Sequence, residues 1–425
     1  EKFMDVVISI KASNTVIMVK TVRLLAHIME KEGMHFPLHL GVTEAGDGED
    51  GRIKSALGIG ALLADGLGDT VRVSLSEAPE AEIPVARKLV DYMTQRRNHP
   101  YIPGAVAPEF HYLSPERRTT TAVHNIGGEN LPVVIAVRLD GNMDFNPQFT
   151  PDYVYAGRQL PEHPIKGMQY IIDADLWNGQ PDTWPAFKSE QLPFVSGFNA
   201  SLKFLFISYM GLDDEAIACL KYHPEIVLVA QSIHPNRLGE YRALAHQLMN
   251  EGLKNPLVFF QHYAEDEVEN LQIKSAADMG ALIIDGFCDG ILLFNQSKQK
   301  GGKKISDQVT DATAFGILQA GRVRTSKTEY ISCPGCGRTL YDLESTIARI
   351  KQATSHLKGL KIGIMGCIVN GPGEMADADY GYVGAGRGKI SLYKKKECIE
   401  KNIPEEEAVE KLIELIKKNG DYTER

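Results

Sequence analysis

The stretch that decides the fold of this chain occurs twice: residues 53–75 read IKSALGIGALLADGLGDTVRVSL, and residues 273–295 read IKSAADMGALIIDGFCDGILLFN. The match extends upstream, where RLLAH at residues 23–27 returns as RALAH at residues 242–246. Each copy runs from apolar residues at helical spacing, through a Gly/Asp turn, into a strand pattern. Successive βα units imply a parallel sheet, either a barrel or a doubly wound sheet. Agreement over three such units indicates a duplicated half-barrel or barrel.

The first copy opens with the same alternation of strand and helix. We expect strands at residues 6–10, 38–43 and 70–75, and helices at residues 14–31 and 53–64, because β-branched runs alternate with helical spacing. The acidic stretch after the second strand does not resemble a phosphate-binding loop, and we interpret it as an ordinary loop.

Four polar side chains fall at or near the carboxyl ends of these strands: Lys11, Glu44, Arg72 and Ser74. Parallel strands build their active sites at this edge. Two cations and a hydroxyl that converge from separate strands suit a phosphate or diphosphate, and the alternative is that they are solvated strand ends. Glu44 is either a cap of the following helix or an acid/base group.

The second copy lacks these polar side chains. Its strand ends carry Leu292 and Phe294 in place of the first copy's arginine and serine, and the uncharged Ala230 falls opposite the lysine. We therefore expect the second copy to be a scaffold. Between the copies, residues 98–130 have the composition of a linker with a long loop, and after the second copy residues 297–304 have that of a solvated loop.

Composition limits the class of protein. A chain of 425 residues suggests about three domains, and 43% hydrophobic with 24% charged residues is typical of a globular protein. The net charge of −9 argues against nucleic-acid binding, and no apolar run is long enough to span a bilayer. Six cysteines are sparse for this length and favour a reducing compartment. Because Glu1 leads at once into a strand pattern, we expect a longer protein of which this is the C-terminal part.

A different pattern begins near residue 330. It consists of a short strand, a turn with two cysteines, a helix over residues 343–350, and a strand over residues 361–365. The closing stretch, residues 404–418, has the Glu/Lys pattern of an amphipathic helix that only packs.

Three cysteines of this last region lie in two short motifs: Cys333 and Cys336 in CPGCGR, and Cys367 in GCIVNGPGE, which ends at Glu374. A Cys-x-x-Cys pair can direct two thiolates at one centre, and the third cysteine adds another. Three thiolates are one short of a closed structural site. This deficit suits a [4Fe–4S] cluster whose fourth iron takes Glu374 or a substrate.

Two other interpretations stay open on spacing alone. The Cys-x-x-Cys turn also resembles a thiol–disulfide oxidoreductase, and a zinc site completed by His356 or Glu374 is the other alternative. A redox dithiol has no use for a third thiol, and zinc would usually show a second close pair, so iron–sulfur is favoured. Cys219 and Cys288, in apolar runs, and Cys398, after three lysines, are expected to be structural.

Six motifs occur in a fixed order along the chain. They are SIKAS at 9–13, LHLGVTEAG at 38–46, IKSA at 53–56, GLGDTVRVSL at 66–75, CPGC at 333–336 and GCIVNGPGE at 366–374. Together they resemble the hydroxymethylbutenyl diphosphate synthase family, the iron–sulfur reductive dehydroxylases of the methylerythritol phosphate (MEP) route to isoprenoids. The middle departs from the family's short bacterial form and is similar to the long form of plants and certain bacteria, which has an extra barrel-like domain.

The resemblance implies an α/β protein of three parts. Residues 1–97 would be the C-terminal βα units of a catalytic TIM-type barrel. Residues 98–325 would be an inserted, degenerate barrel-like α/β domain that serves as scaffold. Residues 326–425 would be an α+β domain that holds the [4Fe–4S] cluster.

The resemblance also implies an activity: reductive ring opening and dehydroxylation of 2-C-methyl-D-erythritol 2,4-cyclodiphosphate to 4-hydroxy-3-methylbut-2-enyl diphosphate with two electrons. The residues that match the family's functional positions are the cluster ligands Cys333, Cys336, Cys367 and Glu374, the diphosphate-binding Lys11, Arg72 and Ser74, the carboxylate Glu44 implicated in protonation, and Asn370 beside the cluster. The implied electron donor is ferredoxin or flavodoxin, and no nucleic-acid or membrane partner is expected. A homodimer stays open. The implied location is the bacterial cytoplasm, or the plastid stroma in a plant or alga.

Overall fold

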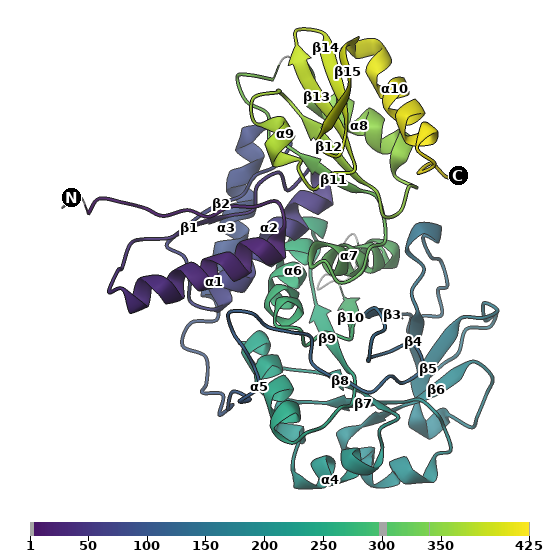
Figure 1. The fold of residues 1–425 in the computed structure, drawn as a ribbon. Coiled ribbons are helices and arrows are strands. Elements are labelled where there is room, and N and C mark those ends of the chain that lie inside the picture. The colour runs from purple at the N-terminus through teal and green to yellow at the C-terminus, as the bar shows by residue number, and fades with distance from the viewer. Residues whose placement is uncertain (1–3, 297–303, 340, 425) are drawn as a thin grey trace. The chain divides into compact units, whose positions relative to one another are not determined.

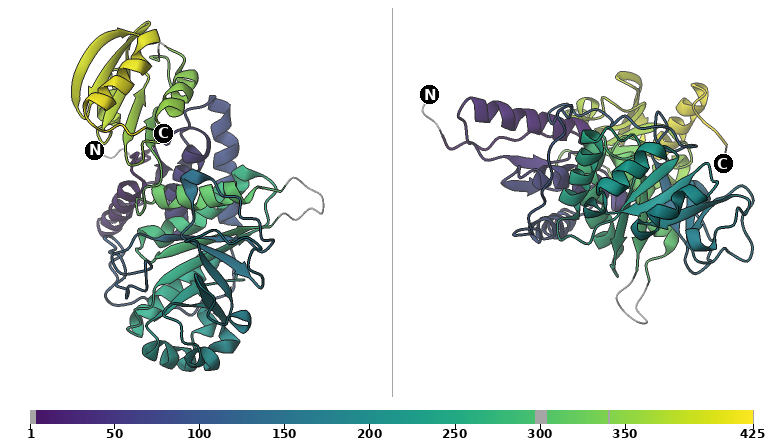
Figure 2. Two further views of the ribbon diagram at one scale, coloured as in Figure 1. Left: turned by 90° about the vertical axis from the view of Figure 1, so that its right-hand side faces the viewer. Right: turned by 90° about the horizontal axis from the view of Figure 1, so that it is seen from below.

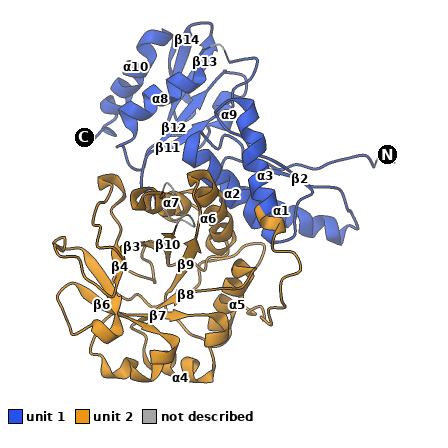
Figure 3. Cartoon of the chain, turned by 180° about the vertical axis from the view of Figure 1, so that it is seen from behind, with its two compact units in different colours: residues 1–91, 325–425 blue, residues 92–324 orange. Residues whose placement is uncertain are grey.

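The computed structural model describes residues 4–296, 304–339 and 341–424 (Figure 1). The chain divides into two compact units: the first contains residues 1–91 and 325–425, and the second contains residues 92–324 (Figure 3). The second unit is thus continuous in sequence, whereas the first combines both terminal segments. Of the loop expected at residues 297–304, only Lys304 lies within the described residues.

The second unit is a closed barrel of parallel strands (Figure 1). Around the barrel the strands are β3 (Val133–Val137), β4 (Tyr153–Gly157), β5 (Gln169–Asp173), β6 (Thr183–Lys188), β7 (Lys203–Ile207), β8 (Ile226–Ala230), β9 (Leu257–Tyr263) and β10 (Gly290–Asn295). Closure is made by β10, which pairs with both β9 and β3. Side chains such as Ile135, Phe204 and Leu292 fill the interior. The expected barrel-like fold of this segment is confirmed as a complete barrel, and its role as a scaffold stays a prediction.

Helices cover only part of this barrel. They are α4 (Asp214–Tyr222), α5 (Arg237–Asn250), α6 (Val268–Ile284) and α7 (Asp307–Ala320). The strands β4 to β6 are instead followed by loops and short 3-10 turns, η3 (Ala174–Leu176) and η4 (Ser189–Gly197) (Figure 2). A regular TIM barrel carries an α-helix after every strand. The barrel is therefore degenerate, as expected from the sequence.

The segment expected to be a linker, residues 98–130, is irregular but packs on the barrel. Arg118 is buried and donates to the carbonyls of Leu253 and Asn255, at 3.0 and 2.5 Å. Arg117 pairs with Asp289 at 2.8 Å. The expected long loop is therefore present, and these arginines attach it to the residues just before β9 and β10.

The duplication is confirmed by an ion pair that occurs once in each unit. Arg23 of α1 (Thr15–Lys31) contacts Asp65 at 2.8 Å, where α2 (Gly48–Ala64) ends. Arg242 of α5 contacts Asp285 at 2.8 Å, where α6 ends. The two arginines and the two aspartates occupy matching places in the repeat.

A second contact repeats in the same way. The carboxylate of Asp69 accepts the N–H of Leu38 at 2.8 Å, and that of Asp289 accepts the N–H of Leu257 at 2.9 Å. In each copy the aspartate before one strand thus fixes the start of its neighbour. Two repeated polar contacts show that the copies share backbone geometry as well as sequence.

The strand pairing changes by one residue which position of the second copy matches Lys11. Ile8 bridges Leu38 in the first copy, whereas Leu228 pairs with Leu257 in the second. Since Leu38 and Leu257 are equivalent, Lys11 corresponds to Gln231 and not to Ala230. The replacement is uncharged either way, so the loss of the cation in the second copy stands.

The first unit contains two βα units and a further helix from the N-terminal segment. These are α1, β1 (His39–Gly41), α2, β2 (Thr70–Arg72) and α3 (Glu82–Thr94), with β1 and β2 parallel. The strand expected at residues 6–10 is wrong as a continuous strand, because only isolated bridges form at Ile8 and Ala12. The acidic stretch expected to be a loop supplies the first turn of α2. There the positive end of the helix dipole stabilises the negative charges of Glu49 and Asp50.

The C-terminal segment forms an α+β fold around a mixed five-stranded sheet. Its elements are β11 (Glu329–Ser332), α8 (Leu343–Thr354), β12 (Lys361–Met365), α9 (Gly371–Glu374), β13 (Tyr380–Gly386), β14 (Lys389–Lys394), β15 (Glu397–Pro404) and α10 (Glu405–Lys418). The sheet order follows the sequence, parallel from β11 to β13 and antiparallel to β15. The helix α10 buries Leu412 and Ile416, so its predicted packing role is confirmed.

The scaffold role of the second copy predicts the effect of Leu292→Ala. Leu292 is 1% exposed inside the barrel, so truncation should leave a cavity and lower the free energy of unfolding by roughly 2–5 kcal/mol. Urea unfolding measures this. Leu139→Ala is the control, because Leu139 is 54% exposed in the same unit and should cost little. Equal stability of the two variants would contradict the predicted core position.

Candidate functional site

The first unit contains a cavity of about 240 Å³ lined by both of its chain segments. Glu44, Arg72 and Ser74 come from the N-terminal segment, and Cys333, Cys336, Cys367, Asn370 and Glu374 come from the C-terminal segment. The structure therefore brings together every predicted site residue except Lys11, across some 290 positions of sequence (residue 44 to residue 333).

Glu44 follows β1 and is 7% exposed. Its backbone adopts a left-handed conformation, with φ of 48°, which non-glycine residues rarely adopt. Burial raises the pKa of the carboxyl, and nearby Glu374 raises it further, against a hydrogen bond with Thr43 and the charge of Arg72. The alternative that Glu44 caps the following helix is wrong, because Asp47 is the residue at the N-cap of α2.

Lys11 lies beside the strands that end at the cavity but does not line it. A Cβ on Gly41 would stand 2.9 Å from the Arg72 carbonyl and 3.2 Å from Lys11 Cε, so glycine is required for the strand and the lysine to pass this closely. Burial lowers the pKa of Lys11, and the positive charge of Arg72 lowers it further. His39 also has a lowered pKa, through burial and then Lys11 and Arg72. The strand ends thus concentrate positive charge that an anion would stabilise.

The Cys-x-x-Cys turn begins at the end of β11. The Cys333 sulfur accepts the N–H of Gly366 at 3.2 Å, and the Cys336 sulfur accepts the N–H of Arg338 at 3.4 Å. The bond from Arg338 lowers the pKa of the exposed Cys336 thiol, whereas burial raises that of Cys333. Gly335, between the cysteines, has φ of +74°, a conformation that glycine adopts without steric cost, so the turn requires glycine at this position.

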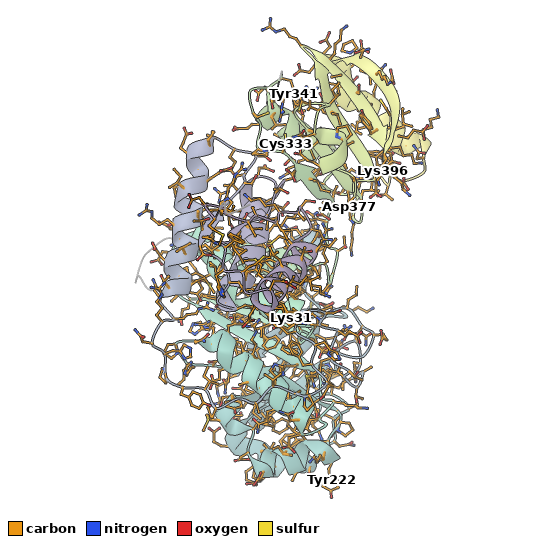
Figure 4. The ribbon with its side chains drawn as sticks, turned by 60° about the vertical axis from the view of Figure 1, so that its left-hand side comes forward. Lys31, Tyr222, Cys333, Tyr341, Asp377 and Lys396 are labelled. Carbon is orange, nitrogen blue, oxygen red and sulfur yellow. The ribbon has the colours of Figure 1, made fainter. Side chains whose placement is uncertain are left out.

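The second cysteine loop follows β12. Gly366 is pressed against Thr339, whose Oγ1 would stand 2.2 Å from an added Cβ. The Tyr341 hydroxyl donates to the Met365 carbonyl at 3.0 Å, and Figure 4 shows Tyr341 close to Cys333 in this part of the molecule. The short helix α9 begins after Asn370 and ends with Glu374, so one turn places both side chains at the cavity that Cys367 lines.

The arrangement of these donors can be compared with the needs of different metal groups. Within residues 4–296, 304–339 and 341–424, no three His, Cys, Asp or Glu side chains meet at a single point as ligands of one ion would. Two cysteines on one loop and a third on another line one cavity, and backbone N–H groups donate to the sulfurs of Cys333 and Cys336. This donor set fits a cluster in which every ligand binds a different iron.

Three polar residues that line the cavity were not predicted: Thr43, Arg338 and Thr339. Thr43 hydrogen-bonds the adjacent glutamate, and Thr339 accepts the N–H of Cys336 at 3.1 Å. Their position next to predicted residues, in TEAG and CPGCGRT, is the signal that was present.

In the described part of the chain, none of the helices has the length and apolar character needed to cross a bilayer.

Comparison with known proteins places both chain ends in one family. Residues 1–87 match the GcpE TIM-barrel domain, and residues 329–418 match the GcpE protein C-terminal domain. A relative from Bacteroides fragilis is 77% identical over 425 residues, covering 100% of this chain and 67% of the relative. One from Bacteroides thetaiotaomicron is 76% identical over 417 residues, covering 98% and 67%.

A more distant relative, from Chlorobaculum tepidum, is 38% identical over 495 residues, covering 100% of this chain and 65% of the relative. All three are named 4-hydroxy-3-methylbut-2-en-1-yl diphosphate synthase (flavodoxin). The chain spans about two thirds of the length of these relatives. At this identity and coverage, the chain belongs to the 4-hydroxy-3-methylbut-2-en-1-yl diphosphate synthase (GcpE) family.

Proposed function

We propose that the protein converts 2-C-methyl-D-erythritol 2,4-cyclodiphosphate into 4-hydroxy-3-methylbut-2-enyl diphosphate, as an iron–sulfur oxidoreductase of the MEP isoprenoid pathway. The observation that carries the proposal is the single cavity at which the basic and acidic strand ends and the cysteine loops meet. The relatives' names specify flavodoxin, which is therefore the electron donor we propose in preference to ferredoxin. These relatives are bacterial, which favours the bacterial cytoplasm over the plastid stroma.

In this proposal Cys333, Cys336 and Cys367 hold a [4Fe–4S] cluster, with Glu374 as the fourth ligand. When bound, the cluster would pass on electrons from flavodoxin and would provide a Lewis-acidic iron. The N–H bonds to the Cys333 and Cys336 sulfurs stabilise the thiolates that such a group requires. A carboxylate is a weaker partner for iron than a thiolate, so Glu374 leaves this position exchangeable.

The residues of the chain supply binding and proton transfer. Lys11, Arg72 and Ser74 hold the diphosphate by charge-assisted hydrogen bonds. Glu44 retains a proton at pH values where an exposed glutamate has lost it, because its pKa is raised by burial, and it can deliver that proton to the reacting carbon skeleton. Asn370, at the start of α9, orients the substrate beside the cysteine loops.

The test uses the full-length protein, purified without oxygen and supplied with reduced flavodoxin and the cyclodiphosphate. Formation of hydroxymethylbutenyl diphosphate, measured by liquid chromatography with mass spectrometry, is the expected result. The alternative of a thiol–disulfide oxidoreductase predicts instead that the protein reduces insulin disulfides and leaves the cyclodiphosphate unchanged. That outcome would overturn the proposal.

Replacement of Lys11 tests the diphosphate site. Lys11→Ala should weaken substrate binding by about 1.5–3 kcal/mol, the usual contribution of a hydrogen bond to a charged group, with little loss of folding stability. Isothermal titration of the full-length protein with the cyclodiphosphate measures the change. Lys31→Ala is the control, since Lys31 is exposed at the end of α1 (Figure 4) and should bind like the wild type. An unchanged dissociation constant for Lys11→Ala would remove Lys11 from the site.

A further inference from the structure

A group of lysine–carboxylate contacts joins the two chain segments of the first unit. Lys327 contacts Glu49 at 2.5 Å and Asp50 at 2.8 Å, both in the first turn of α2. Lys351 of α8 contacts Asp47 at 2.5 Å. We call these contacts, together with the next pair, the lysine clamp.

In the remaining pair of the clamp, the N-terminal segment supplies the lysine and the C-terminal segment supplies the carboxylate. Lys54, one turn further along α2, contacts Glu329 of β11 at 3.2 Å and donates to the Tyr330 carbonyl at 3.3 Å. The side chains of Lys54 and Glu329 are 8% and 7% exposed, and those of Lys327 and Asp50 are 14% and 15% exposed. Ion pairs at this depth are screened little by solvent, and the loss of one partner leaves a charge without compensation.

The electrostatics agree with this geometry. Burial opposes the charged form of Lys327, yet Asp50 and Glu49 hold its pKa above the ordinary value. Burial likewise opposes the charged form of Asp50, but Lys327, then Lys351 and Lys54, keep its pKa low. Both partners are therefore ionised at neutral pH.

The clamp acts on the strand that carries the first cysteine. At the far end of β11, Ser332 pairs with Ala45 in a parallel bridge and accepts a hydrogen bond from the Ser76 hydroxyl at 3.0 Å through its carbonyl. Ala45 follows Glu44 directly, and Cys333 follows Ser332 directly. The strand β11 thus connects the side of the cavity that carries Glu44 with the side that carries Cys333.

We propose that the lysine clamp positions β11, and so fixes the separation between the Glu44 side of the cavity and Cys333. The lysines of the clamp are positioning residues, because they do not line the cavity and do not belong to the cysteine loops. They are Lys54, Lys327 and Lys351. A displacement of about 1 Å in such a site can cost about 10²-fold in rate even when the altered residue is remote from the chemistry. The turnover readout of this inference rests on the proposed function, whereas its structural readout does not.

The experiment compares Lys327→Met with Lys411→Met in the full-length, cluster-containing protein. Lys411 pairs with Glu400 inside the C-terminal segment, at 33% and 47% side-chain exposure, and within the described part of the chain it forms no ion pair with α2. For Lys327→Met we expect iron per chain unchanged, kcat reduced at least tenfold and KM within about twofold, since positioning acts on the reacting geometry. Hydrogen exchange of peptides covering residues 329–336 should become faster. Lys411→Met should match the wild type in every measurement.

A charge exchange at the outer pair separates positioning from general destabilisation. Asp47→Lys and Lys351→Glu should each lower kcat, and the double variant should recover most of it, because the pair is restored with its signs reversed. Wild-type kcat and exchange in Lys327→Met would overturn the inference, as would failure of the double variant to recover when both single variants are impaired. Absence of turnover in the wild type itself, with faster exchange in Lys327→Met, would refute the proposed function and leave the clamp intact.

Discussion

Cys333→Ser is expected to yield a full-length protein without its visible absorption, with little bound iron and with no measurable turnover. A serine hydroxyl does not ionise near neutral pH, so it cannot replace a thiolate as a cluster ligand. Cys333 is also the half-buried cysteine whose sulfur accepts the Gly366 N–H, so its loss disturbs both cysteine loops. Iron analysis and the broad band near roughly 400 nm, recorded on protein kept from oxygen, measure the effect.

The control for this substitution is Cys398→Ser. Cys398 is a half-buried cysteine of the same domain, but it lies in β15 and does not line the cavity. It should retain iron and activity. Equal loss in both variants would indicate a general folding defect, and stoichiometric zinc in the oxygen-free wild type would contradict the cluster.

Glu44→Gln is expected to lower kcat by about 10²–10⁴-fold, the usual contribution of a positioned acid or base, with KM changed much less. Glutamine keeps the shape and polarity of the side chain but has no proton to give. Since burial raises the pKa of Glu44, its proton is lost at a higher pH than that of an exposed glutamate. In the wild type, kcat should therefore fall as the pH rises through this raised pKa.

The pH profile provides the check on this assignment. Glu44→Asp should regain part of the rate and keep an alkaline limb, because a shorter carboxyl remains and Asp tolerates the left-handed backbone at this position. Glu44→Gln should lose that limb. A variant Glu44→Gln that turns over at the wild-type rate would show that the proton comes from elsewhere.

The fold could be predicted in the repeat and in parts of the C-terminal segment, where β12 and α10 lie close to their predicted residues. Two copies of one helix–turn–strand stretch report the same local structure twice, and hydrophobic periodicity is the strongest local signal in a sequence. The prediction of a strand at residues 6–10 was wrong because a run of β-branched residues also occurs in extended segments, and this one forms only isolated bridges. The start of α2 was predicted too late because its acidic run was interpreted as a loop. The same residues suit a helix N-terminus, where the helix dipole favours negative charge.

The candidate site was predictable to the extent that motif residues converge through strand ends. Glu44, Arg72 and Cys333 each follow or end a strand, and the edge of a parallel sheet gathers such positions. The lysine clamp could not be predicted. Its partners, such as Asp47 and Lys351, look like ordinary surface charges in sequence, and only tertiary packing puts them in contact.

The twin ion pairs, Arg23 with Asp65 and Arg242 with Asp285, have a consequence for engineering. They mark two versions of one scaffold, and in the proposed function only the first takes part in the chemistry. Active sites tend to lower stability, and the first version holds a left-handed Glu44 and a desolvated Lys11 beside Arg72. In this proposal the second version has only to fold. Its buried helix residues therefore form a ready-made library of tolerated side chains, from which the catalytic half can be made more robust without touching its chemistry.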